Sequence, residues 1–174
     1  VVTTQTPTYV YKCPNGLLTK QKSLVKVGEN AILELYFDEV VPYEDAHYLQ
    51  ETIIEMEKGA SVILTDGLTA GWSQYRFTGL KTIIKKEGKE VLNDFLICDP
   101  TVENMEDIGL FEGNSNFNSV VIIDEELDKV CLEQFRKVLD SLETPCQYGV
   151  TQIDAGIVLR ILGPSYHENR RIMW

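Results

Sequence analysis

The sequence between Gly28 and Pro100 contains one short pattern about three times. Each copy opens on a glycine turn, at Gly28, Gly59 and Gly88, and continues into alternating apolar residues; the glycines stand 31 and 29 residues apart. Repeats of roughly 20–50 residues usually form stacked supersecondary units that bury their apolar faces against one another. Because these units are β-branched and aromatic runs broken by Gly, Asn and Asp, they are typical of strands. The pattern therefore predicts stacked β-sheet layers, similar to a β-solenoid, joined at the three glycines.

The same reasoning predicts the remaining strands. Residues 48–56 are the one ambiguous segment, since Leu, Gln, Glu and Met would also suit a helix; the alternation and the following Gly59 favour a strand. Residues 66–73 are interpreted as a loop, and 108–111 as at most a short strand. Strands are expected over 17–27, 31–37, 48–56, 62–65, 75–85, 91–98, 119–123, 148–152 and 156–162, with a hairpin turn at Glu87-Gly88.

Two helices are predicted near the end of the chain. The first covers 125–143, capped by Asp124 and stopped by Pro145. The second opens at Ser165-x-x-Glu168, a capping-box pattern. The first helix carries an apolar stripe that should pack on the sheets, formed by Leu127, Val130, Cys131, Gln134, Val138 and Leu142. The fold expected is thus mainly β, in one domain over 1–174, with two peripheral α-helices.

Composition excludes some functions. The net charge of −11 argues against nucleic acid or an anionic membrane as a partner, because both require a basic face. No run has the length and apolarity of a membrane span, and no secretory signal is found. The four cysteines form no C-x-x-C pair, which favours buried thiols in a reducing compartment. The chain opens without Met and its last helix is cut short, so we expect a fragment.

Catalytic motifs are missing from the sequence. The two histidines, His47 and His167, lie in different predicted elements, and no nucleophile and base can be paired from the sequence pattern. The glycines fit neither a P-loop nor a dinucleotide-binding motif. We therefore expect a protein that is not an enzyme. The alternative is a β-layered ligand-binding module or enzyme whose site no motif encodes.

Two acids stand inside apolar strands and are the most informative polar residues. Glu34 lies within an apolar run, and Asp66 directly follows another. A buried carboxylate costs several kcal/mol unless it is paired, hydrated or bound to a cation. Either strand alternation points these acids at solvent, or they line an internal polar path for a cation. Tyr43 and Trp72 are interpreted as core or interface anchors.

Five short segments, in the same order, resemble the urease accessory protein D family (UreD, also called UreH), and the likeness spans essentially the whole chain. Each is weak alone, but five in order are fairly specific. The family's N-terminal portion and most of its last helix have no counterpart, in agreement with a fragment. The segments are Thr4-Gln5-x-x-Thr8-x-Val10-Tyr11-Lys12, Val40-Val41-Pro42-Tyr43-x-x-Ala46, Gly59-Ala60-Ser61 with Asp66-x-Leu68-Thr69-x-Gly71-Trp72-Ser73, Leu92-Asn93-Asp94-x-Leu96-x-x-x-Pro100, and Gly156-Ile157-Val158-Leu159-Arg160-Ile161.

The resemblance implies a cytoplasmic, non-enzymatic maturation factor built from stacked sheets and two helices. It would bind urease apoprotein and the accessory proteins F and G, and assist insertion of nickel into urease. No permanently bound cofactor is implied, only transient Ni²⁺. In this setting we expect Glu34, Asp38 and Asp66 to face a shared polar interior that passes Ni²⁺, because carboxylates bind a borderline cation and release it again. Tyr43 and Trp72 are the expected interface residues.

Overall fold

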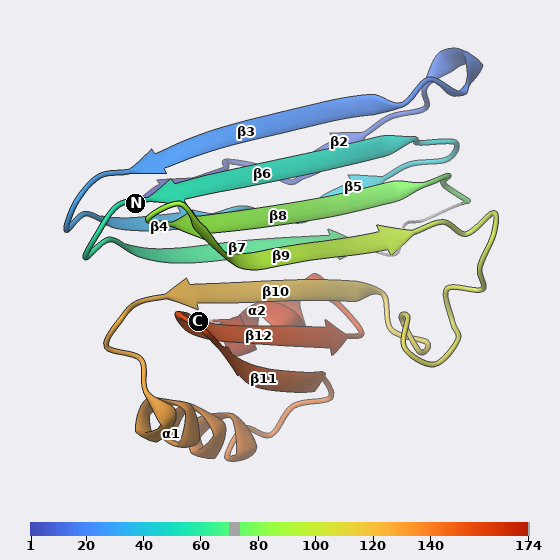
Figure 1. Cartoon of the computed structure of the whole chain (residues 1–174). Coiled ribbons are helices and arrows are strands. Elements are labelled where there is room, and N and C mark those ends of the chain that lie inside the picture. The colour runs from blue at the N-terminus through green and yellow to red at the C-terminus, as the bar shows by residue number, and fades with distance from the viewer. Residues whose placement is uncertain (70–73, 174) are drawn as a thin grey trace.

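Two β-sheets lie face to face in the computed structural model, which describes residues 1–69 and 74–173 (Figure 1). One sheet, called sheet A here, has the order β1-β4-β7-β10-β12-β11, with β5 beside β7 and β2 beside β5; sheet B has the order β3-β6-β8-β9. The strands are β1 (Val2–Thr3), β2 (Thr8–Val10), β3 (Thr19–Val27), β4 (Ile32–Tyr36), β5 (Val40–Pro42), β6 (Tyr48–Met56), β7 (Ser61–Thr69), β8 (Thr78–Lys86), β9 (Lys89–Cys98), β10 (Asn116–Ile123), β11 (Gln147–Ile153) and β12 (Gly156–Gly163).

The repeated pattern corresponds to a coil that alternates between the two sheets. The chain crosses from β3 in sheet B to β4 in sheet A at Gly28, and from β6 to β7 at Gly59. Corresponding strands then stack in parallel: Thr19 lies beside Tyr48, and Tyr48 lies beside Thr78. The prediction of a mainly β fold in stacked layers with two helices is confirmed, and so is a strand over 48–56.

The third glycine behaves differently from the first two. Gly88 joins β8 to β9 within sheet B, as an antiparallel hairpin, so it is not a junction between layers. The two turn residues, Glu87 and Gly88, have φ of 48° and 80°. Positive φ at both central residues is the geometry of a tight hairpin turn, which reverses the chain within one sheet. The hairpin predicted at Glu87-Gly88 is confirmed, whereas the expected third junction is wrong.

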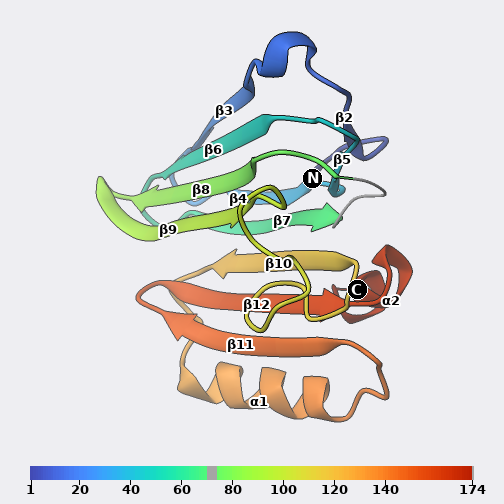
Figure 2. The same ribbon diagram turned by 90° about the vertical axis from the view of Figure 1, so that its right-hand side faces the viewer.

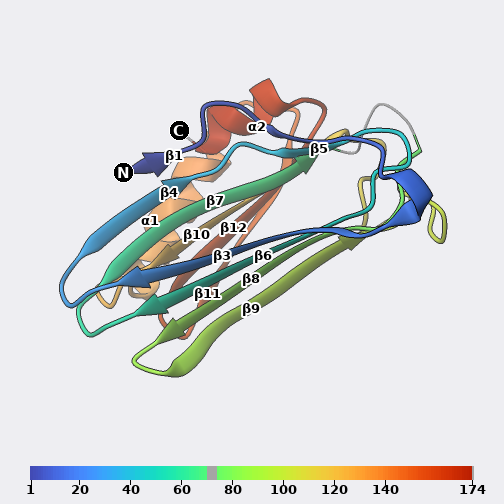
Figure 3. The ribbon, with the colours of Figure 1, turned by 90° about the horizontal axis from the view of Figure 1, so that it is seen from above.

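The main core fills the space between the sheets. Inward residues alternate along each strand, and those that are at most 1% exposed include Ile54, Val62, Leu64, Ile84 and Ile123. A second apolar cluster, which includes Val120, Leu139, Leu159 and Ile161, lies on the outer face of sheet A. Sheet A is therefore buried on both faces in its centre, with sheet B on one side and helices on the other (Figure 3).

Strand β7 is longer than the sequence pattern indicates. It continues through Asp66 to Thr69, because β10 pairs with it along its whole length, from Val62 beside Ile123 to Thr69 beside Asn116. The expected loop is therefore wrong for 66–69, and its remainder, 70–73, lies outside the described residues. The segment 108–111, for which at most a short strand was expected, forms turns.

Helix α1 (Lys129–Asp140) starts later than predicted. Its N-cap is Asp128, whose side chain accepts a hydrogen bond from the Cys131 N–H at 2.9 Å. The predicted cap, Asp124, instead accepts a hydrogen bond from the Ser61 hydroxyl at 2.6 Å. Because Ser61 is the first residue of β7, this hydrogen bond holds Asp124 at the end of β10, and Asp124 does not begin a helix.

The face of α1 that packs on sheet A is not the predicted stripe. Leu132 and Leu139 are buried, whereas Val130 and Val138 are each 62% exposed and Leu142 is 38% exposed. The helix has apolar residues on two adjoining faces, and the sheet covers the one containing Leu132 and Leu139. Helix α2 (Tyr166–Met173) also lies outside sheet A and buries Asn169. No helix in 1–69 or 74–173 is long and apolar enough to cross a membrane.

Candidate functional site: buried carboxyls on both faces of sheet A

Strand β7 places the Asp66 carboxyl between the two sheets. Its oxygens accept hydrogen bonds from Gln50 Nε2, at 3.2 and 3.3 Å, and from the Gly67 N–H at 2.9 Å. The Tyr48 hydroxyl in turn lies 3.3 Å from Gln50 Oε1 and 3.0 Å from Gln21 Oε1. A line of polar side chains therefore runs from β3 through β6 to β7 inside an otherwise apolar core.

The protonation of Asp66 is set by its burial. Removal from solvent raises the pKa of Asp66 to about 7, although the hydrogen bonds from the Gly67 N–H and Gln50 lower it. Burial and the nearby Asp66 also raise the pKa of Tyr48 to about 12. Near neutral pH the Asp66 carboxyl therefore exists both with and without its proton, and a small change in its surroundings moves that balance.

A small cavity adjoins Asp66 between the sheets. Its volume is about 20 Å³, and its polar lining comes from Thr82, Asp94 and Ser119 as well as Asp66. Among the described residues the buried Ser119 hydroxyl oxygen has no hydrogen-bond partner. A cavity of this size has room for one water molecule or a small ion. The arrangement can thus hold a single polar guest against a carboxyl group.

A second buried acid, Glu39, lies on the outer face of sheet A. It is 3% exposed, and its Oε2 accepts hydrogen bonds from Asn116 Nδ2 at 2.7 Å and the Thr69 hydroxyl at 2.8 Å. Burial raises the pKa of Glu39 to about 7, against the effect of these hydrogen bonds. Asn169 of α2 completes the group by donating to Asn118 Oδ1 at 2.8 Å. The sequence interpretation missed Glu39; the signal available was Asn116-x-Asn118, two amides on one face of an apolar strand.

Gly67 allows Asp66 and Glu39 to lie at the same position of β7 on opposite faces of sheet A. A Cβ at Gly67 would collide with the Asn118 amide and the Phe117 carbonyl, and would lie 3.0 Å from the Glu39 side chain. The adjacent Asp66 points to the opposite face. Consecutive residues of β7 therefore bring one buried acid to the inner face and leave space for another on the outer face.

The three acids predicted to share an interior are not brought together. Leu33 and Leu35 pack into the inner core, so Glu34 between them points to the outer face, where its Oε2 accepts a hydrogen bond from the Tyr36 hydroxyl at 3.1 Å. Asp38 accepts from the Tyr166 hydroxyl at 2.7 Å. Strand alternation separates Glu34 from Asp66, because an offset of one residue reverses the face. Within the described residues no group of three or more His, Cys, Asp and Glu side chains is placed to hold a metal ion.

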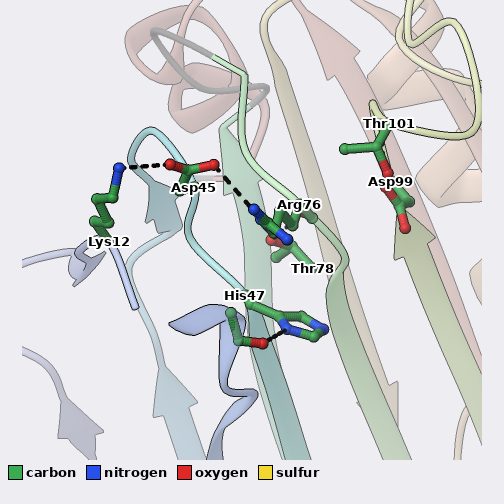
Figure 4. Close-up of polar contacts among 8 residues, drawn as sticks. Lys12, Asp45, His47, Arg76, Thr78, Asp99 and Thr101 are labelled. Carbon is green, nitrogen blue, oxygen red and sulfur yellow. Dashed lines mark hydrogen bonds and ion pairs between the residues drawn. The ribbon is translucent and has the colours of Figure 1, made fainter. Parts of the chain in front are cut away.

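Tyr43, one of the predicted interface residues, lies in a partly exposed aromatic cluster. Its ring is 6.1 Å from that of Tyr9 and 5.1 Å from that of Tyr11. Close by in the sequence, Asp45 forms ion pairs with Lys12 at 2.6 Å and Arg76 at 3.5 Å (Figure 4). Trp72, the other predicted interface residue, lies outside the described residues. The role of Tyr43 in an interface stays a prediction.

His47 is fixed by a structural contact. Its Nδ1 donates to the Gly16 carbonyl at 2.9 Å (Figure 4). The His47 ring also meets the Phe77 ring edge-on. The second histidine, His167, is exposed on α2. Fold and site together define a layered β protein with two buried carboxyls, Asp66 and Glu39, held by amides and hydroxyls.

Comparison with known proteins gives this layered β protein a family. Residues 1–174 match the family described as UreD urease accessory protein, so the chain belongs to that family and the resemblance seen in the sequence is confirmed. The chain is 39% identical to the urease accessory protein UreD of Streptococcus thermophilus (strain ATCC BAA-250 / LMG 18311), with 100% of the chain aligned. It is 29% identical to UreD of Lachnoclostridium phytofermentans, with 98% aligned. The chain spans 65% of the length of each of these relatives.

Proposed function

We propose that this chain belongs to a urease maturation factor of the cytoplasm. It binds urease apoprotein and the accessory proteins F and G, and assists insertion of nickel into the urease metallocentre. Membership of the UreD urease accessory protein family over all 174 residues carries this proposal.

Nickel enters the proposal as cargo and not as a resident cofactor. Carboxylates suit a cargo role because they bind a borderline cation less tightly than thiolate or imidazole does. Of the three predicted residues, Asp66 is the best supported, since it adjoins the interior cavity and its pKa is about 7. A metal ion entering there displaces the proton, which couples loading to pH. Glu34 and Asp38 lie on the outer side of sheet A, so they do not line this cavity.

The test is nickel loading in cells that carry the full-length protein with Asp66→Asn. This variant keeps the side-chain volume but removes the ionisable oxygen. We expect less nickel in urease and lower urease activation, while co-purification with urease and the accessory proteins stays at the wild-type level. Glu34→Gln is the matched control for an outward acid. Unchanged activation in Asp66→Asn, or a loss explained entirely by failed assembly, would refute a role for Asp66 in nickel transfer.

A further inference from the structure

Strand β9 is a long, open edge of sheet B. It pairs with β8 on one side, and no described strand pairs with the other (Figure 1). Proteins commonly protect such edges with lysines, prolines or very short strands. The opposite edge of sheet B, β3, follows that rule with Lys20, Lys22 and Lys26. Strand β9 runs for ten residues; its exposed charged residues, Lys89 and Glu90, lie at its start, and its second half exposes Phe95 and Ile97.

Sheet A continues past this edge and forms a shelf. Strands β12 and β11 extend beyond β9, and no described strand lies over their inner face (Figures 1 and 2). Gly149 lies opposite Arg160, and Thr151 lies opposite Val158, which packs in the inner core. Arg160 marks the boundary, since its Nη2 donates to Asp94 of β9 at 2.6 Å. The shelf is formed by four exposed residues: Gln147, Gly149, Thr151 and Arg160.

An apolar pocket adjoins the shelf near the end of β9. Its volume is about 160 Å³, and its apolar walls include Leu96, Leu110, Phe111 and Phe117, with Arg160 also lining it. This volume suits one large apolar side chain. Arg160 has five N–H donors and makes one hydrogen bond among the described residues, so it can accept a second carboxylate. One region of the surface therefore contains the open edge of β9, the shelf, the apolar pocket and the unused N–H donors of Arg160.

We propose that β9 and the shelf receive one extended strand from a partner protein. The strand pairs with β9 through main-chain hydrogen bonds, which supply affinity, while side chains facing the shelf supply specificity. Alternate residues of a strand share one face, so the matching sequence is a large apolar residue and an acidic residue two positions apart. The first fills the pocket, and the second binds the free N–H groups of Arg160.

The shape of the shelf excludes a second copy of this chain as the occupant. Among the described strands, β12 and β11 project past β9 (Figure 2), and strands lie about 4.8 Å apart, so this shelf is about 10 Å wide. A symmetric β9–β9 pair would place the second copy's β10 beneath its own β9. That space is already filled by β12 and β11 of the first copy. The site therefore accommodates a single strand or a hairpin, but not another sandwich.

The experiment uses the full-length protein and short overlapping peptides covering the urease subunits and accessory proteins F and G; this choice of probes rests on the proposed function. Binding is measured by fluorescence anisotropy, and amide hydrogen exchange locates the contact. Gly149→Trp fills the shelf, because a Cβ there meets open space. Gly28→Trp is the matched control, since its Cβ also meets open space, at the β3–β4 turn. Thermal unfolding of both variants checks that each is folded.

We expect a peptide with the apolar-x-acid pattern to bind and to slow exchange of the β9 amides. Gly149→Trp should weaken binding at least about tenfold, roughly 1.4 kcal/mol, with Gly28→Trp close to wild type. The proposal is overturned if no peptide binds, if β9 exchange is unchanged, or if both variants behave alike. It is also overturned if the β9 amides that do not pair with β8 are already protected in the free protein, which would show that another segment of the chain, or a second copy, covers them. Nickel loading in the Asp66→Asn variant is measured separately. A failure of peptide binding at β9 therefore does not decide whether the proposed function is correct.

Discussion

Asp66 lies in β7 and Glu39 packs against it, and both carboxyls are buried. Their burial makes the free energy of unfolding depend on pH. In an unfolded chain each would titrate in the ordinary range for a carboxyl group. In the fold, burial raises the pKa of both to about 7. Between those limits the folded state binds more protons than the unfolded state, so stability falls as pH rises. The stabilising contribution is complete below the unfolded pKa and is lost as pH passes the folded pKa.

This linkage predicts the pH dependence of Asp66→Asn. The wild type should lose stability, on the order of a few kcal/mol, as pH rises from about 4 to about 7, and the variant should show a smaller loss because Asn does not titrate. Glu39 still titrates in the variant, so part of the slope remains. Urea unfolding across this pH range measures the slopes, with Glu34→Gln as the control expected to match wild type. Equal slopes in Asp66→Asn and wild type would contradict the burial assigned to Asp66.

For single residues, the sequence shows which acids stand among apolar neighbours, but it does not always show which face of the sheet each side chain occupies. Asp66 alternates with Val62, Leu64 and Leu68, so its inward direction was available from the pattern once the strand was known to continue. Interpreting 66–69 as a loop removed that information. Glu39 had no such signal of its own, because its burial depends on Asn116 and Thr69, which are distant in sequence.

At the scale of elements, α1 shows how packing chooses between two apolar faces. Leu139 lies in the last turn of α1 and Leu142 lies just after the helix ends; Leu139 is 3% exposed, whereas Leu142 is 38% exposed. Leu139→Ala should destabilise the protein by about 2–5 kcal/mol, because it removes a buried side chain and leaves a cavity. Leu142→Ala should cost clearly less. Chemical denaturation of the two variants checks this, and equal losses would mean that the helix face is assigned incorrectly.

Local periodicity predicted most strands but not their ends or partners. The alternation over 48–56 predicted β6 with the bounds that the structure shows, because no distant contact was needed to define it. The end of β7 was missed because β10, which supports it, begins at Asn116. The start of α1 was missed for the same reason, since Asp124 forms its hydrogen bond with Ser61 instead of capping the helix. Errors thus fall where one element is completed by another far away in the chain.

The whole molecule joins two kinds of β structure in one sandwich. From β3 to β8 the chain coils between sheets and stacks parallel strands. The later strand pairs, β8–β9, β10–β12 and β11–β12, are antiparallel. Sheet A unites both parts, because β7 pairs in parallel with β4 and antiparallel with β10. The glycine repeat predicted the first part. The second part has no repeat, so its attachment to β7 could not be derived from sequence periodicity.

This arrangement predicts that the core between the sheets unfolds as one unit. Ile54 of β6 is fully buried against residues of β7, β8 and β10, whereas Leu24 of the edge strand β3 is 58% exposed. Ile54→Ala should lower stability by about 2–5 kcal/mol and speed amide exchange in β6, β7, β8 and β10 together, because cooperative units open as a whole. Leu24→Ala is the control and should leave these amides nearly unchanged. Hydrogen exchange followed by mass spectrometry resolves the strands. Faster exchange confined to β6 would show instead that the two sheets open independently, and that β7 does not couple the coiled and antiparallel parts.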